Sequence, residues 1–203
     1  MNSPIFYPNG QLSAYIEHLK TVYRNAITVE SGRYFTTVNE LTDQLPATRA
    51  FTLTAAVEVL DSLITPGIVS NKILVEEDKG AIIGGAYSYI TGLPLAIARM
   101  YSYDIPGGIA VPIEMEYMKG RLLVNGLSAG DRLMLIDDTL ATGGTIIALA
   151  KAAELANAQI VDIRVIVEKL GMGGRERIRD KLGIEVKSAI QISIDKTGKI
   201  EVM

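Results

Sequence analysis

Acidic, hydroxyl and glycine residues are concentrated in one stretch of the sequence, residues 132–149, RLMLIDDTLATGGTIIAL. Its first five residues, 132–136, form a mostly apolar run that suits a buried strand, and Asp137 and Asp138 follow that run directly. From Thr142 onward, apolar and small residues recur at the spacing of a helix. The stretch therefore predicts a strand, an acidic turn, a loop and a helix.

The loop in this stretch has the composition of a phosphate site. Glycines permit positive φ and let a ligand approach the backbone closely, and the N–H groups at the start of a helix have no partner within it. Such a helix start binds anions. An ATP-type loop is excluded, because it needs a lysine after its second glycine and none is present. The candidate phosphate ligands are Ala141, Thr142, Gly143, Gly144 and Thr145.

The two aspartates need a role of their own, because carboxylates beside a phosphate site would repel a bare polyphosphate. Accepting hydrogen bonds from neighbouring sugar hydroxyls, or holding the waters of a Mg²⁺ ion, would suit Asp137 and Asp138. Aspartates and loop together predict a site for a ribose 5-phosphate.

The motif LIDDTLATGGT resembles the binding motif for 5-phosphoribosyl 1-diphosphate (PRPP) in type I phosphoribosyltransferases, and it matches at every defined position. The resemblance extends over residues 72–182. It implies an α/β fold with a mainly parallel central sheet, helices on both faces, a β-hairpin flap and a small hood. It implies one domain, 1–203, with an N-terminal helix and hood in 1–50, a core in 51–190 carrying the flap at about 101–125, and a tail in 191–203.

Composition limits the remaining possibilities. A chain of 203 residues suits a single domain. It has no cysteine, a net charge of −3, no apolar run long enough for a membrane span, and no secretion signal at its start. We therefore expect a cytoplasmic protein that binds neither membrane nor nucleic acid.

A second charged turn, which contains both acidic and basic residues, follows the apolar run 72–75. It resembles the pyrophosphate loop of the family, which implies that Lys79 and nearby backbone N–H groups hold the diphosphate of PRPP. The residues of this loop are Glu77, Asp78, Lys79 and Gly80.

Arg99 closes the apolar strand predicted at 94–100, so it points to the carboxyl edge of the sheet, where ligands of such sheets bind. It matches the arginine of an Arg-Lys pair in adenine phosphoribosyltransferases. Met100 and Asp104 stand where those enzymes carry lysines, and this departure bears on how the diphosphate is handled.

Residues 101–125 are rich in glycine, proline and tyrosine and then alternate in polarity, which suits a β-hairpin arm. The resemblance implies a flexible cover that excludes water from the reaction. Glu116 and Tyr117 resemble part of the Leu-Glu-Tyr-Gly sequence of adenine-specific members. Glu116 is thus the candidate acid, base or orienting group at the purine.

Helical spacing of apolar residues predicts a first helix over 11–27, whereas 33–47 shows no sustained period and predicts irregular structure or short strands. By resemblance this second segment belongs to the hood and presents backbone groups to the base. The candidates there are Val38, Asn39 and Leu45.

The resemblance implies a pentosyl-transferring glycosyltransferase of purine salvage that acts with Mg²⁺ bound to PRPP, and a homodimer. The loop sequence around Ala141, combined with Glu116 and Tyr117, favours adenine as the base and AMP as the product. Hypoxanthine and guanine stay open, because some enzymes for these 6-oxopurines place an acid at Ala141 and others do not. Orotate is disfavoured, since the flap lacks many lysines. A PRPP- or purine-sensing regulator and a purely structural subunit are the alternatives from other functional classes.

Overall fold

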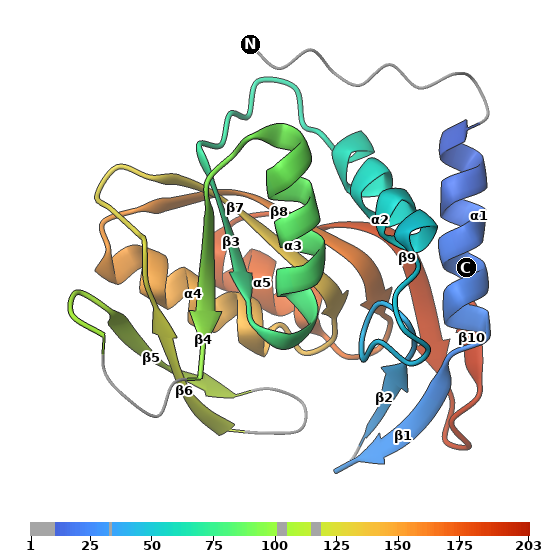
Figure 1. Cartoon of the computed structure of the whole chain (residues 1–203). Helices are drawn as coiled ribbons and strands as arrows, with labels where there is room; N and C mark the ends of the chain where they lie inside the picture. Colours follow the sequence, from blue (N-terminus) through green and yellow to red (C-terminus); the bar gives the residue numbers. More distant parts are fainter. Residues whose placement is uncertain (1–10, 33, 101–104, 115–118) are drawn as a thin grey trace.

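An eight-stranded sheet forms the centre of the computed structural model, which describes residues 11–32, 34–100, 105–114 and 119–203 (Figure 1). In spatial order its strands are β10 (Ile200–Val202), β9 (Lys187–Ile194), β8 (Gln159–Lys169), β7 (Arg132–Leu140), β3 (Lys72–Glu76), β4 (Leu95–Arg99), β6 (Lys119–Val124) and β5 (Ile109–Glu114). The inner strands from β9 to β4 are parallel. The outer strands join in antiparallel orientation. The predicted mainly parallel sheet is confirmed.

The order of the strands reverses at β3. Its neighbour on one side is β4 and its neighbour on the other side is β7, and both pairs are parallel. Helix α3 (Asp78–Thr91) follows β3, and helix α4 (Gly144–Leu155) follows β7. At such a switch point the connections after the two strands diverge and leave a crevice at the carboxyl ends, where open α/β sheets bind ligands.

Helices cover both faces of the sheet, as predicted (Figure 1). Helices α1 (Gln11–Arg24), α2 (Ala50–Ser62) and α3 pack on one face, and α4 and α5 (Gly174–Leu182) pack on the other. Strand residues alternate between the two cores, so that Ile73 and Val75 of β3 face the first and Leu74 faces the second. Among the described helices, none is both long and apolar enough to cross a bilayer.

The N-terminal segment and the tail lie against each other. Strands β1 (Ile27–Ser31) and β2 (Tyr34–Val38) form an antiparallel hairpin. The Thr28 hydroxyl donates to the Gly198 carbonyl at 2.8 Å, in the turn between β9 and β10. A Cβ at Gly198 would lie 2.6 Å from that hydroxyl oxygen, so the contact needs glycine. The N-terminal hairpin and the C-terminal tail are therefore in contact.

The first helix ends earlier than its apolar spacing predicts. Helix α1 ends at Arg24, and Ile27 begins β1 with a side chain that is 58% exposed. Ile27 and Val29 are β-branched and alternate with polar residues, a pattern that favours a strand over another helical turn. The helix prediction for residues 25–27 is wrong for this reason.

The hairpin predicted within 101–125 is present as β5 and β6, which pair in antiparallel orientation. Strand β6 also pairs with β4, so the hairpin extends one edge of the main sheet. Glu116, Tyr117 and Asp104 lie outside the described residues, and the predictions for them are untested.

Candidate active site

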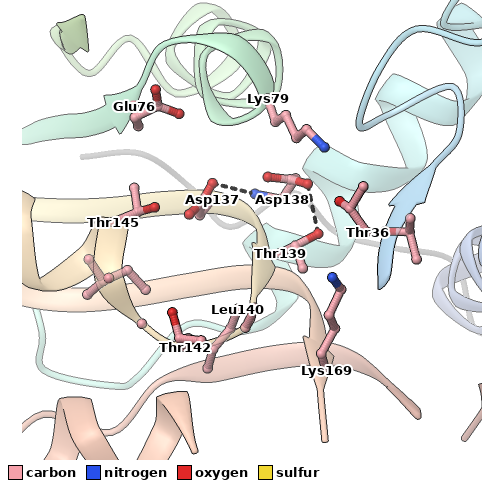
Figure 2. A pocket seen from close by; sticks show the side chains of 15 residues that line it. Thr36, Glu76, Lys79, Asp137, Asp138, Thr139, Leu140, Thr142, Thr145 and Lys169 are labelled. Atoms are coloured by element: carbon pink, nitrogen blue, oxygen red, sulfur yellow. Dashed lines mark hydrogen bonds between the residues drawn. The ribbon is translucent and has the colours of Figure 1, made fainter. Parts of the chain in front are cut away.

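A pocket opens at the carboxyl ends of β3 and β7, where the strand order reverses (Figure 2). Carboxylates, hydroxyls, glycines and lysines line it, and they come from the ends of several strands and from the starts of α3 and α4. The lining residues are Thr36, Thr37, Glu76, Lys79, Asp137, Asp138, Thr139, Leu140, Ala141, Thr142, Gly143, Gly144, Thr145, Ile146 and Lys169.

Asp137 and Asp138 reach the pocket from β7 (Figure 2) and are 9% and 3% exposed. The backbone N–H of Asp138 donates to Asp137 Oδ1 at 3.0 Å. The Thr139 hydroxyl donates to Asp138 Oδ2 at 2.7 Å. These bonds hold both carboxylates in place, and because a carboxylate offers about four acceptor positions, both can still accept hydrogen bonds from ligand hydroxyls.

The pocket concentrates negative charge. Burial raises the pKa of Asp137, and the carboxylates of Asp138 and Glu76 raise it further. Glu76 is buried at the end of β3. Neighbouring buried carboxylates disfavour one another's charge, so the pocket suits a ligand that brings hydrogen-bond donors or positive charge. A sugar with two adjacent hydroxyls meets the first requirement.

The predicted phosphate loop surrounds the start of α4. Gly143 is the N-cap of that helix, with φ of +75°, a left-handed conformation that glycine adopts without a steric penalty. The first turn of α4 contains no acidic residue. All of residues 141–145 line the pocket together with Asp137 and Asp138. The structure thus brings the residues predicted to bind the ribose and those predicted to bind the phosphate into one site.

The start of α3 approaches β7 closely at Gly80. A Cβ at Gly80 would lie 3.2 Å from Asp137 Oδ1 and 3.3 Å from the Ile136 carbonyl oxygen. Lys79 lines the pocket from this turn (Figure 2), and its ammonium lies 3.3 Å from Asp43 Oδ2. The predicted diphosphate lysine and the aspartate pair therefore face the same cavity.

The other residues predicted to bind the diphosphate are not among the described residues that line the pocket, but they lie next to it. Glu77 is the N-cap of α3, and its Oε1 lies 3.6 Å from Arg99 Nε, so the end of β4 adjoins the end of β3. Asp78 opens α3, but its side chain is not among those the structure describes. Met100 is exposed.

The part of the hood that reaches the pocket is slightly upstream of the predicted part. Thr36 and Thr37 of β2 line it, whereas Val38, Asn39 and Leu45 are not among the described lining residues. The Asn39 side chain instead accepts hydrogen bonds from backbone N–H groups two and three residues later, at 2.8 and 3.1 Å. Leu45 is 57% exposed.

Sequence reasoning missed Lys169, which closes β8. Its side chain is buried and points toward the pocket (Figure 2), and its ammonium donates to the Phe35 carbonyl at 2.9 Å. Lys169 also lines a second, adjoining pocket, together with Tyr34, Phe35, Leu170, Met172, Ile194, Asp195 and Lys196. A charged residue at the end of an apolar strand was the signal that singled out Arg99, and applied to β8 it would have found this lysine.

Solved structures share this fold. An adenine phosphoribosyltransferase from Thermoanaerobacter pseudethanolicus aligns with a TM-score of 0.72 and 23% identity, over 87% of this chain and 99% of that one. The enzyme from Giardia lamblia, in complex with 9-deazaadenine, aligns with a TM-score of 0.67 and 22% identity, over 82% and 93%. At these identities the comparison establishes the fold.

Relatives found by sequence comparison have higher identity to this chain than these solved structures do. A scan against models of protein families gives no match. A hypoxanthine/guanine phosphoribosyltransferase from Methanocella arvoryzae is 33% identical over 180 residues, which cover 89% of this chain and 92% of the relative. One from Methanothrix thermoacetophila is 35% identical over 182 residues, covering 89% and 93%. With the fold, the PRPP motif and relatives of this identity along nearly its whole length, the chain belongs to the type I phosphoribosyltransferase family.

Proposed function

We propose that this protein transfers the 5-phosphoribosyl group of PRPP to a purine base and releases diphosphate. The observation that carries the proposal is the meeting of Asp137 and Asp138 with the loop 141–145 in one pocket at the switch point of the sheet. The names of the sequence relatives support a purine as the acceptor.

Each part of the pocket has a task in this reaction. Asp137 and Asp138 accept hydrogen bonds from the ribose hydroxyls, and the N–H groups of 141–145 bind the 5-phosphate. Lys79 binds the diphosphate, with Arg99 nearby at the end of β4. A ring nitrogen of the base attacks C1 of the ribose, the bond from C1 to the diphosphate oxygen breaks, and the base loses a proton. Catalysis then rests on orientation and on stabilisation of charge at C1.

Mg²⁺ belongs to this proposal through the substrate. Among the described residues, no cluster of three or more acidic or histidine side chains could hold a metal ion by itself. The carboxylates of Glu76, Asp137 and Asp138 offer the oxygen donors that Mg²⁺ prefers, so they fit an ion that arrives on PRPP and is also held by waters. When bound, Mg²⁺ supplies positive charge to the diphosphate leaving group. The hairpin of β5 and β6 would cover the site, and Glu116 would face the base.

Adenine is the base that the loop sequence and Glu116 favour. It remains the first candidate, and AMP would be its product.

By family resemblance we also expect a homodimer, which sedimentation would test.

A 6-oxopurine is the second candidate, because of Lys169. An ammonium group is only a donor, so at the base it would pair with the carbonyl oxygen of hypoxanthine or guanine and not with the amino group of adenine. Its present acceptor, the Phe35 carbonyl, is of the same chemical type. The names of the relatives agree with this candidate.

The test measures diphosphate release from PRPP and Mg²⁺ with adenine, hypoxanthine, guanine, xanthine and orotate in parallel. Turnover with adenine alone supports the first candidate, and turnover with hypoxanthine or guanine supports the second. If PRPP binds and no base is turned over, the proposal fails in favour of a PRPP-sensing regulator.

A substitution of Lys169 separates the two candidates further. Lys169→Met should raise KM for a 6-oxopurine by about 10-fold, the value of one lost hydrogen bond to a charged group, and leave KM for PRPP nearly unchanged. Lys151→Met, at an exposed lysine of α4, is the matched control. An unchanged KM for the preferred 6-oxopurine would remove Lys169 from the base site.

A further inference from the structure

The start of α5 packs backbone to backbone against the phosphate loop. A Cβ at Gly174 would lie 2.1 Å from the Ala141 carbonyl oxygen and 2.9 Å from Leu140 Cδ1. A Cβ at Gly143 would lie 3.2 Å from the Gly174 carbonyl oxygen and from Ile178 of α5. Only hydrogen fits at Gly174, so the first turn of α5 and the loop touch without intervening side chains.

Arg177 adds a directed contact to this packing. Its Nη1 donates to the Thr142 carbonyl oxygen at 3.2 Å. In a planar trans peptide, the carbonyl of one residue and the N–H of the next point in opposite directions. Because the Thr142 carbonyl accepts this bond, the N–H of Gly143 points away from the Arg177 guanidinium, and both residues of this peptide line the pocket.

The helix that carries Arg177 is itself fixed to the sheet. Arg175 donates to Glu168 Oε1 at 2.8 Å and to the Ser188 hydroxyl at 2.9 Å. Glu168 is buried at the end of β8 and also accepts from Gln191 at 3.0 Å. The hydrogen bond from Arg175 is the largest influence that lowers the pKa of Glu168. The start of α5 is thus held to β8 and β9, and the contact from Arg177 has a rigid base.

We propose that Arg177 is a positioning residue for the 5-phosphate: by holding the Thr142 carbonyl it aims the N–H of Gly143 at the phosphate. This inference rests on the proposed function, which assigns the 5-phosphate to the loop 141–145. The relevant contribution is to binding of the phosphoribosyl group. The 5-phosphate is bound with the same strength in the ground state and in the transition state. Loss of the contact should therefore raise KM and leave kcat unchanged.

The test compares Arg177→Met, Arg177→Lys and the control Arg179→Met with the wild type. Arg179 lies on the same helix, is exposed, and has its Nε 3.8 Å from Asp180 Oδ1. Arg177→Met should raise KM for PRPP and the Kd for ribose 5-phosphate by about 10-fold, as expected for a lost charged hydrogen bond. KM for the base and kcat should stay within about twofold. Arg177→Lys keeps a cationic donor and should restore part of the affinity.

Calorimetry with ribose 5-phosphate and thermal unfolding of the same variants separate the possible outcomes. If the wild type binds ribose 5-phosphate and Arg177→Met binds it equally well, the inference is overturned while the proposed function stands. A lower Tm of Arg177→Met with an unchanged Kd would show a purely structural role and overturn it too. If the wild type binds neither ribose 5-phosphate nor PRPP, the proposed function itself fails, and the inference fails with it.

Discussion

At the scale of single residues, Asp137 is kept at a cost to stability. Burial, Asp138 and Glu76 raise the pKa of Asp137, so the folded protein binds a proton there more readily than the unfolded chain does. The free energy of unfolding therefore falls as pH rises from the ordinary aspartate pKa through the raised one. A buried carboxylate that destabilises the free protein and serves a ligand is typical of functional sites.

Removing that charge should stabilise the ligand-free protein. We predict that Asp137→Asn raises Tm at neutral pH by a few degrees and flattens the pH dependence of Tm, because the amide carries no buried charge and can still accept from the Asp138 N–H. Turnover should be lost. Calorimetry between pH 5 and 8 checks this result.

Asp195→Asn is the control for this prediction. Asp195 is exposed, and a hydrogen bond from Thr197 lowers its pKa, so its charge is favoured in the folded state. This variant should not raise Tm. A drop in Tm for Asp137→Asn at neutral pH would show that its charge does not destabilise the fold.

The contact of Lys169 with the hood marks the limit of prediction from sequence at this scale. The aspartates and the phosphate loop were predicted because adjacent residues within one stretch carry the chemistry. Lys169 and its acceptor Phe35 are 134 residues apart, and nothing local in the sequence pairs them. Only the packing of the hood against the end of β8 brings them together.

At the scale of elements, α3 shows why a helix next to the site is built from small residues. Gly84 faces β3, where a Cβ would lie 2.4 Å from Val75 Cγ1. Close approach of α3 to the sheet also places Lys79 at the pocket. At the neighbouring Gly85, a Cβ would enter open space, with no atom of another described element within 4 Å, so this position has no such constraint.

The adjacent glycines give opposite predictions. Gly84→Ala should lower the free energy of unfolding by about 1–3 kcal/mol, because the buried valine is stiff and cannot move aside. Gly85→Ala should raise it by about 0.5–1 kcal/mol through helix propensity. Urea unfolding of both variants makes the comparison, and stabilisation by Gly84→Ala would contradict the packing described for α3.

Single helices and strands were more predictable from the sequence than the strands that pair with them in the sheet. Strand and helix signals placed β4, β7 and α4, because each signal is local, although β7 runs on to Leu140 through the aspartates that were predicted to form a turn. The end of α1 was misjudged, since helical spacing and strand alternation overlap around Ile27. The position of β6 beside β4 depends on tertiary pairing that no local pattern encodes.

At the scale of the whole molecule, a buried polar cluster joins the sheet to the helices of one face. Arg164 of β8 donates to Asp162 at 2.8 Å, to the Leu60 carbonyl of α2 at 3.0 Å and to the Tyr87 hydroxyl of α3 at 3.0 Å. Lys187 of β9 donates to Asp162 at 2.5 Å. One guanidinium thus connects the sheet with α2 and α3.

Breaking this cluster should destabilise the fold strongly. We predict that Arg164→Met lowers the free energy of unfolding by about 3–5 kcal/mol, because buried acceptors lose their donor. Lys151→Ala breaks an exposed ion pair with Glu154 and should cost less than about 1 kcal/mol. Equal losses in the two variants, measured by urea unfolding, would show that Arg164 has no such role.

The central claim is that the pocket at the ends of β3 and β7 transfers a phosphoribosyl group to a purine. The most direct measurement follows the formation of two products, a nucleoside monophosphate and free diphosphate, from PRPP, Mg²⁺ and a purine. It compares the wild type with a variant that carries both Asp137→Asn and Asp138→Asn. We predict one nucleotide per diphosphate in the wild type, and a rate lower by about 100-fold or more in the variant, whose site no longer stabilises the reacting ribose. Equal rates in both proteins, or no nucleotide from the wild type with any purine, would contradict the claim.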